Sequence, residues 1–457
     1  MSGARFGAYG RVMSQPVLRR LLPGMLVSAL GDGMSLVAVA WLAVQIAPPG
    51  REGVWTGLAV AAYSLPATVG AAVFGRLVRG LTGARLVAID ATLRAVALGT
   101  IAVLAVAGAL APAGYVALLG ASSLLHAWGS AGTYTLIAEL LPDDDRVAGN
   151  ALVSTFTQAA VVVGPALAGG VVALAGPGWV IGADALSFAA LAASCWPVAA
   201  RHASVTAPAP AASAAAAAAA SPAASAAADG PAAGGWRTIV GQPRLLGLLA
   251  VTCVFFFLYG PVEVALPIHV ATELHGSPGL LGAYWTVFGV GAVAGGLGAG
   301  LLRNRPLWAV VVIIIVGWGA ALLPLGLSDA VLPGLIGFAV GGLVYGPFTA
   351  ICTALFQRAC APQVLSRVLA TRTALTTPST AVGMLLGGPV VSAIGGRSTL
   401  LASAVLTIAL GVLVAVAVRI ARLRLDASRA AAPVAAEPQP LDAGRLVRGS
   451  AARGAGR

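Results

Sequence analysis

The sequence predicts an all-α integral membrane protein with twelve transmembrane helices in two six-helix bundles. Of its 457 residues, 59% are hydrophobic and only 9% are charged, whereas about 25% are charged in an average soluble domain. The apolar stretches run for about 20 residues or more, the length of a helix that crosses a bilayer. They show no sustained alternation of apolar and polar residues, which argues against a membrane β-barrel.

Twelve apolar stretches of helical length follow one another along the chain. The first six are Leu21–Ile46, Val54–Val78, Leu86–Leu110, Tyr115–Leu140, Ala151–Ala175 and Trp179–Ala199. The second six are Leu245–Val270, Leu280–Leu302, Leu307–Leu327, Val331–Phe356, Leu369–Ile394 and Leu400–Arg419. Residues 21–200 and 244–420 are therefore expected to form the two bundles.

Three segments outside the bundles are polar or rich in alanine and proline. Residues 1–20 are basic and are expected to remain as a cytoplasmic segment before an uncleaved first span. Residues 201–243 are read as a cytoplasmic linker that is rich in alanine and proline, with an amphipathic stretch, Trp236–Arg244, at its end. Residues 421–457 are expected to be a disordered cytoplasmic tail.

The arginines predict the orientation in the membrane. All 27 basic residues are arginine and the net charge is +12. With the N-terminus in the cytoplasm, 24 of them fall on the cytoplasmic side, including Arg358, Arg367 and Arg372, which are counted with the connection of the tenth and eleventh spans. Only Arg51 and Arg397 fall outside, and Arg94 lies within a span. This excess predicts a multi-pass protein of the inner or plasma membrane with both termini in the cytoplasm; it explains the basic charge without a nucleic-acid partner.

The two halves share internal landmarks. The connection before the fifth span reads ELLPDDDRVAGNAL and the one before the eleventh reads QRACAPQVLSRVLATRTAL, each with a proline followed by an arginine four or five residues later. A Gly-Pro pair follows in each next span, Gly164-Pro165 and Gly388-Pro389. These echoes indicate a parallel duplication, which is typical of transporters that move two bundles about a central site.

Carboxylates at membrane depth are costly, which makes them candidate functional residues. Asp32 lies near the middle of the first span and Glu263 lies in the seventh, between two prolines. Both are candidates to carry a proton, because burial in an apolar environment favours the neutral acid. For Asp32 a structural role, in tying or capping a neighbouring helix, is the alternative. Asp90 and Arg94 are four residues apart and so share a helix face, where they are expected to pair.

Other polar and aromatic residues have weaker claims to function. Glu139 is expected at the membrane boundary, and His126 in the fourth span is ambiguous. Aromatic side chains could line a cavity for an amphipathic substrate, although packing or contact with lipid explains each one as well. The candidates are Trp41, Tyr63, Tyr259, Tyr284 and Tyr345.

Several phrases together resemble the major facilitator superfamily, and in particular its drug and siderophore exporters. They are SALGDGMSLVA, RLVAIDATLRA, NALVSTF, GPALAGG, DALSF and FGVGAVAGG. The resemblance implies a fold of two six-helix bundles with alternating access. It also implies an antiporter-like motif at Gly164, Pro165, Gly169 and Gly170, a gate role for the Asp90 and Arg94 region, and a structural role for Asp184.

The loop after the second span departs from the superfamily's pattern. Gly75 matches, but Arg79 stands where an aspartate is expected and Gly80 stands where an arginine is expected. Arg85 fits only with a shift of one residue. The charge lock that the resemblance implies for this loop is therefore in doubt.

These patterns predict a secondary active transporter, not an enzyme, that exports small drug-like or siderophore-like amphipathic compounds in exchange for protons. No phosphate loop, metal cluster or nucleophile–base pair is recognisable in the sequence, so no cofactor or metal is expected. The expected partners are the substrate, protons and the lipid bilayer, with the protein as a monomer. Two alternatives are proton-coupled uptake or lipid transport by the same fold, and a membrane scaffold or sensor that transports nothing.

Overall fold

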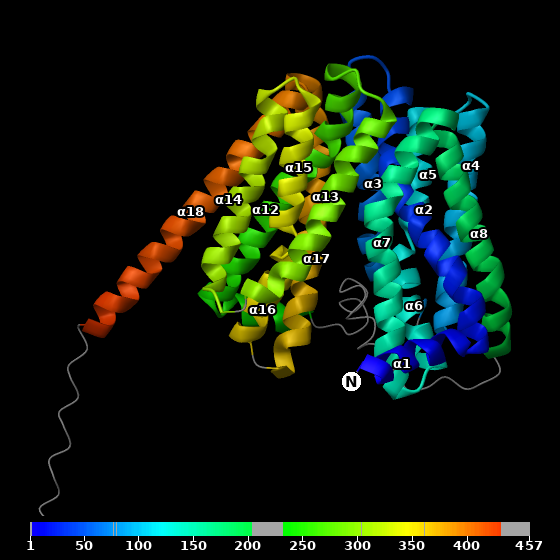
Figure 1. The fold of residues 1–457 in the computed structure, drawn as a ribbon, viewed down its shortest axis with the longest axis horizontal. Helices are drawn as coiled ribbons and strands as arrows, with labels where there is room; N and C mark the ends of the chain where they lie inside the picture. Colours follow the sequence, from blue (N-terminus) through cyan, green and yellow to red (C-terminus); the bar gives the residue numbers. More distant parts are fainter. Residues whose placement is uncertain are drawn as a thin grey trace, which may run out of the picture. The chain divides into compact units, whose positions relative to one another are not determined.

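The computed structural model describes residues 2–75, 77–78, 80–202, 232–302, 304–360 and 362–430, and all the regular structure in these ranges is helical (Figure 1). The first group of helices comprises α1 (Ser2–Ser14), α2 (Pro16–Ile46), α3 (Glu52–Phe74), α4 (Gly83–Val106), α5 (Pro112–Ser123), α6 (His126–Leu140), α7 (Asp143–Ala175) and α8 (Pro177–His202). The second comprises α11 (Ala232–Val240), α12 (Pro243–Ile268), α13 (Pro278–Gly298), α14 (Leu307–Leu327), α15 (Val331–Tyr345), α16 (Phe348–Ala359), α17 (Pro362–Ile394) and α18 (Gly396–Ala430). The all-α membrane class is confirmed.

Proline begins many of these helices. It stands at the first position of α2, α5, α8, α12, α13 and α17, where its missing N–H leaves no helical hydrogen bond unmade and its fixed φ suits the helix. A π-helical turn, His269–Glu273, extends α12, and a 3₁₀ turn, Ala299–Leu302, extends α13. The observed helices mostly begin a few residues before the predicted spans because these prolines precede the apolar runs.

Eleven helical segments of the described chain are long and apolar enough to cross a membrane, one fewer than predicted. The difference is the fourth span, which is divided into α5, with 12 residues, and α6, with 15. At the break, Ser122 donates a hydrogen bond to the carbonyl of Leu119 at 2.7 Å, and Ser123 donates one to the carbonyl of Ala62 on α3 at 2.9 Å. Serine hydroxyls that bond to backbone carbonyls often bend helices, and these two lie directly before the break.

The tenth predicted span is broken at the corresponding place in the second half. α15 ends at Tyr345, and α16 begins after Gly346 and Pro347. Proline explains this break, because its ring clashes with the carbonyl of the preceding turn. The corresponding span is thus interrupted in both halves, with serines at one break and a proline at the other. The comparison of the two halves by sequence did not reveal this similarity.

Helix contacts build each half and join the two. In the first half α2 packs on α7 and α8, and α4 packs on α8; in the second half α12 packs on α17, and α13 packs on α15. The halves meet where α3 contacts α17 and α7 contacts α13. Gly53 and Gly57 of α3 face α17 at Gly388, where an added Cβ on Gly57 would lie 3.1 Å from the Gly388 Cα. Small residues at such crossings let helix backbones approach closely.

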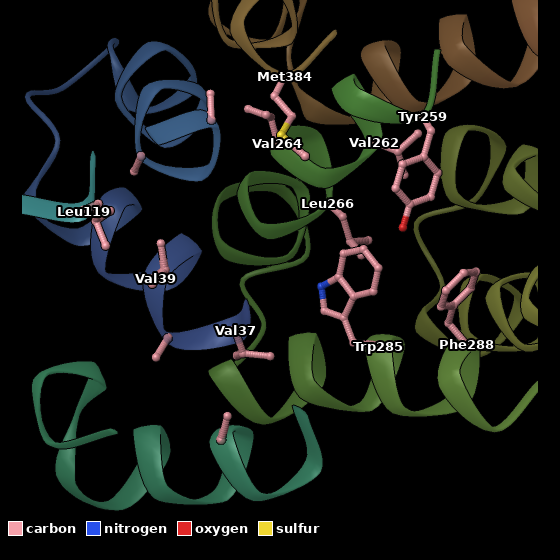
Figure 2. Close-up of a cluster of buried hydrophobic side chains, with 14 of the residues drawn as sticks. Val37, Val39, Leu119, Tyr259, Val262, Val264, Leu266, Trp285, Phe288 and Met384 are labelled. Atoms are coloured by element: carbon pink, nitrogen blue, oxygen red, sulfur yellow. The ribbon is translucent and has the colours of Figure 1, made fainter. Parts of the chain in front are cut away.

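An aromatic core fills the second half. Figure 2 shows Tyr259 on α12 together with Trp285 and Phe288 on α13. Phe288, Trp318 and Tyr345 have ring centroids 5.4 to 5.9 Å apart, at tilted to edge-on angles. These are the separations at which aromatic pairs add stability beyond the burial of their surface. The core holds α12, α13, α14 and α15 together.

Parts of three predictions fall outside the described residues: Arg79, positions 203–231 of the linker, and positions 431–457 of the tail. The described part of the linker includes the short helix α11, which overlaps the predicted amphipathic stretch. The chain up to Val414 forms one compact unit that contains both halves. The predicted boundaries of the two bundles, 21–200 and 244–420, remain predictions.

Candidate functional site

A buried network of polar side chains lies between α2, α3 and α4 of the first half. Arg94 of α4 forms an ion pair with Asp32 of α2. The Arg94 guanidinium also donates a hydrogen bond to the Tyr63 hydroxyl at 2.7 Å, and that hydroxyl donates to the Asp32 carboxylate at 2.8 Å. One carboxylate oxygen therefore accepts two hydrogen bonds, from groups on two different helices.

The two charges of this pair differ in exposure. The Arg94 side chain is 2% exposed, whereas the Asp32 side chain is 32% exposed. The ring of Phe188 from α8 lies against the guanidinium, with its centroid 4.3 Å from Cζ. A buried arginine stays charged and needs a counter-ion. Asp32 supplies that counter-ion while part of its carboxylate stays open to the surroundings, so an external proton or ligand can reach it.

The predicted pairing of Asp90 with Arg94 is wrong: the ion pair of Arg94 is with Asp32. Asp90 points toward α6, where a Cβ added to Gly129 would lie 2.5 Å from the Asp90 Cγ. The four-residue spacing places both side chains on one helix face, but it does not decide which neighbouring helix each one reaches. Arg94 extends to α2 and Asp90 to α6.

His126 connects the two charges that do not pair with each other. Its Nδ1 lies 2.7 Å from Nη1 of Arg94 and 3.8 Å from the Asp90 carboxylate. A guanidinium is only a donor, so Nδ1 must act as the acceptor and the imidazole must be neutral in this arrangement. Protonation of His126 would remove the bond to Arg94 and set two positive charges side by side. The histidine is at the first residue of α6, directly after the break in the fourth span.

Asp184 on α8 is a second buried carboxylate near this network, with 1% exposure. It accepts a hydrogen bond of 2.6 Å from the Ser35 hydroxyl of α2. Gly31 leaves room for it: a Cβ there would lie 3.0 Å from the Asp184 Cγ. This closed arrangement ties α8 to α2, as expected of a structural residue.

Glu263 in the second half has a different environment. It is partly exposed on α12, and no described residue forms an ion pair with it. Tyr259, one turn earlier, interacts with its carboxylate through the hydroxyl. The helix runs through both flanking prolines without interruption, and the irregular turn comes later, at His269–Glu273. The two prolines that flank Glu263 therefore leave the helix continuous at this residue.

The five aromatic candidates are in three settings. Tyr63 belongs to the polar network. Trp41 is buried in the core, and Tyr284 is buried with its hydroxyl 3.3 Å from the carbonyl of Val331. Tyr259 and Tyr345 stack with centroids 6.0 Å apart and lie near Glu263. Tyr259 and Tyr345 therefore combine aromatic surface with a nearby carboxylate.

The antiporter-like motif on α7 faces two helices. At Gly164 an added Cβ would lie 2.7 Å from the Gly33 Cα of α2, and at Gly169 it would lie 2.9 Å from the Gly279 Cα of α13. Gly170 has open space around it, and Pro165 is inside the helix. The motif thus packs α7 against α2 of its own half and against α13 of the other half.

The start of α4, which follows the loop after the second span, is held by Glu139, a residue outside the expected motif. Gly75 caps the end of α3, and Arg85 is exposed in the first turn of α4. The Gly83 N–H at the start of α4 donates to both oxygens of Glu139 on α6, at 3.1 and 3.3 Å. A carboxylate at a helix N-terminus is favourable, so Glu139 has a structural contact that its boundary position did not reveal.

Arg372 is the polar residue whose setting the sequence predicted least well. It was counted among the cytoplasmic arginines, but it is 8% exposed on α17. The sequence offered one indication of this burial, because Arg372 lies three residues inside the predicted eleventh span.

Comparison with known proteins places these features in context. The family model of the Major Facilitator Superfamily matches residues 21–268 and 261–452. The multidrug efflux pump Tap of Mycobacterium tuberculosis is 28% identical over 428 residues, which cover 88% of this chain and 93% of that protein. Tap of Mycolicibacterium fortuitum is 25% identical over 411 residues, covering 88% and 95%.

Solved structures of transporters share the fold. The nucleoside transporter NupG superposes with a TM-score of 0.62 at 13% identity, covering 88% of this chain and 98% of NupG. A bacterial homologue of the human lysosomal transporter Spinster, in an inward-facing and unoccupied conformation, gives a TM-score of 0.59 at 13% identity, covering 88% and 96%.

Proposed function

The chain belongs to the Major Facilitator Superfamily, and we propose that it exports small amphipathic compounds in exchange for protons. It is a multi-pass membrane transporter with relatives among multidrug efflux pumps. The observation that carries the proton coupling is the network of Asp32, Arg94 and Tyr63, in which a partly exposed carboxylate neutralises a fully buried arginine.

Protonation of Asp32 would affect Arg94 as well as the carboxylate itself. A neutral Asp32 no longer balances the charge of Arg94, and an uncompensated buried charge costs several kcal/mol. The guanidinium must then find another partner or more water, which requires α2 and α4 to shift against each other. Binding a proton at Asp32 therefore favours one arrangement of the helices over another, as coupled transport requires.

Glu263 is the second proposed proton carrier. Without a cationic partner, its carboxylate in an apolar helix is held more cheaply as the neutral acid. A positively charged substrate beside Tyr259 and Tyr345 would favour the ionised form. Exchange of one proton for one cationic group at Glu263 is thus possible without a change in the charge of the site.

Helix contacts between the halves support alternating access. The α3–α17 and α7–α13 crossings rest on glycines, so the two halves can separate there without removing large interlocking side chains. Positive charge on one side of the membrane supports a cytoplasmic location of both termini. In the proposed cycle, outward-facing protonation releases the substrate and inward-facing deprotonation prepares the site again.

Everted membrane vesicles test this proposal. With an acidic interior, the wild-type protein should accumulate a cationic dye such as rhodamine 6G, and an agent that dissipates the proton gradient should stop accumulation. Asp32→Asn and Glu263→Gln should each reduce the rate and flatten its dependence on pH. Asp144→Asn, at an exposed carboxylate near the start of α7, should match the wild type.

The outcomes separate the alternatives. Accumulation that continues without a proton gradient would refute proton coupling. Dye movement only in the opposite direction would indicate uptake instead of export. If both variants keep the wild-type pH dependence, the assignment of the proton carriers is wrong.

A further inference from the structure

Arg372 on α17 is a buried arginine without a counter-ion. The residue is 8% exposed, and its Nε is fully buried with no hydrogen-bond partner. Among the described residues no carboxylate lies within ion-pair distance of it. Arg94, the other buried arginine among the described residues, forms an ion pair with Asp32. Because a guanidinium does not lose its proton in proteins, the charge of Arg372 calls for an anion.

Surrounding side chains fix this guanidinium on one edge. Nη1 donates to the Thr353 hydroxyl of α16 at 3.0 Å, and that hydroxyl donates to the Thr349 carbonyl at 2.7 Å. The Phe356 ring lies 5.6 Å from Cζ. Nη2 has no described hydrogen-bond partner, and it is not among the fully buried polar atoms that lack one. Nη2 is thus the donor that remains for a further partner, and a guanidinium N–H that meets a carboxylate forms a strong, charge-assisted hydrogen bond.

The position of Arg372 relates it to Glu263, a carboxylate that also has no ion pair among the described residues. The Tyr345 hydroxyl interacts electrostatically with both Glu263 and Arg372, although no direct ion pair joins those two. Tyr345 also stacks on Tyr259, at 6.0 Å. An acid, two aromatic rings and a base therefore follow one another across α12, α15 and α17. This order complements an amphipathic molecule that carries an anionic group at one end.

We propose that Arg372, positioned by Thr353 and flanked by Tyr345, receives the carboxylate of a transported amphipathic compound. The inference rests on the proposed export function and narrows its substrate class to compounds with an anionic group, including zwitterions whose cationic end faces Glu263. A substrate without an anionic group would not need a buried arginine in its binding site. An arginine with a purely structural role would be expected to pair with a carboxylate of the chain, as Arg94 does.

Rhodamine B and its ethyl ester test this site, because they share one cationic ring system and differ in the free carboxylate. Binding is measured by fluorescence anisotropy on the purified full-length protein in a neutral detergent. The wild type should bind rhodamine B about tenfold more tightly than the ester. Arg372→Gln should remove that preference and leave ester binding within about twofold. Arg372→Lys, which keeps the charge without the planar guanidinium, should retain part of it.

Arg367→Gln is the matched control, at an exposed arginine five residues earlier on the same helix, and should behave as the wild type. Size-exclusion chromatography shows whether each variant is folded. A folded Arg372→Gln protein that still prefers rhodamine B, or that loses both dyes equally, would overturn the proposal. So would displacement of rhodamine B by phosphatidylglycerol at low mole fraction, because the anion would then be a lipid headgroup.

Transport assays in everted vesicles separate this inference from the proposed function. If Arg372 governs rhodamine B binding but no dye movement depends on the proton gradient, the export function fails and the anion site stands. If proton-driven transport of both dyes proceeds at the wild-type ratio in Arg372→Gln, the function stands and the anion site is refuted.

Discussion

The environment of the Asp32–Arg94 pair predicts a loss of stability that depends on which of the two charges is removed. Asp32→Asn keeps the shape of the side chain and a carbonyl oxygen for the Tyr63 hydroxyl, but it leaves Arg94 charged at 2% exposure. Breaking a buried pair from one side costs about 3–5 kcal/mol. Since Asp32 is 32% exposed and water can partly replace it, we expect the lower end, about 3 kcal/mol.

Removing the arginine should cost less. Arg94→Met leaves a carboxylate that already reaches its surroundings and still accepts the Tyr63 hydrogen bond, so we expect about 1.5–2 kcal/mol, the lower end for a lost hydrogen bond to a charged group. The double variant Asp32→Asn/Arg94→Met contains no uncompensated charge. It should therefore be more stable than Asp32→Asn alone, by about 1 kcal/mol or more.

Unfolding of the four proteins in one detergent, followed by tryptophan fluorescence against denaturant concentration, measures this cycle. We expect the free energy of unfolding to recover in part when Arg94→Met is added to Asp32→Asn. Additive losses, or a double variant less stable than Asp32→Asn, would show that Arg94 is not held by Asp32, and the argument that protonation of Asp32 moves α2 against α4 would fail with it.

Three further predictions follow from contacts outside that pair. Gly169→Val should lower transport more than tenfold in the vesicle assay, because its side chain would collide with the α13 backbone, whereas Gly170→Val, with open space around it, should stay near the wild type. Arg11→Gln removes the 2.6 Å ion pair with Asp145; as the arginine is exposed, it should lower the free energy of unfolding only slightly, and the exchange Arg11→Asp/Asp145→Arg should restore most of the loss. His126→Leu removes the acceptor that lies 2.7 Å from Nη1 of Arg94 and should lower the free energy of unfolding by about 1 kcal/mol, whereas His126→Gln, which keeps an acceptor, should stay near the wild type; equal losses in both variants would exclude this bond as the cause.

The sequence was sufficient for the class, the order of the spans and the family, because hydrophobic length and local phrases are properties of contiguous residues. Twenty apolar residues in a row predict a spanning helix wherever its neighbours lie. The same reasoning singled out Asp32 and Glu263, since a carboxylate in such a stretch is costly in any arrangement.

Rotation of the helices about their axes and the choice of their neighbours came only with the tertiary structure. Asp90 and Arg94 share a face, yet one reaches α6 and the other α2. At the break in the fourth span, Ser123 bonds to a carbonyl of α3, a partner 61 residues away in sequence. Arg372 was counted with the cytoplasmic arginines, yet it is 8% exposed and donates a hydrogen bond to Thr353 of α16. In each case the deciding contact is between helices distant along the chain, and hydropathy or spacing within one helix carries no record of it.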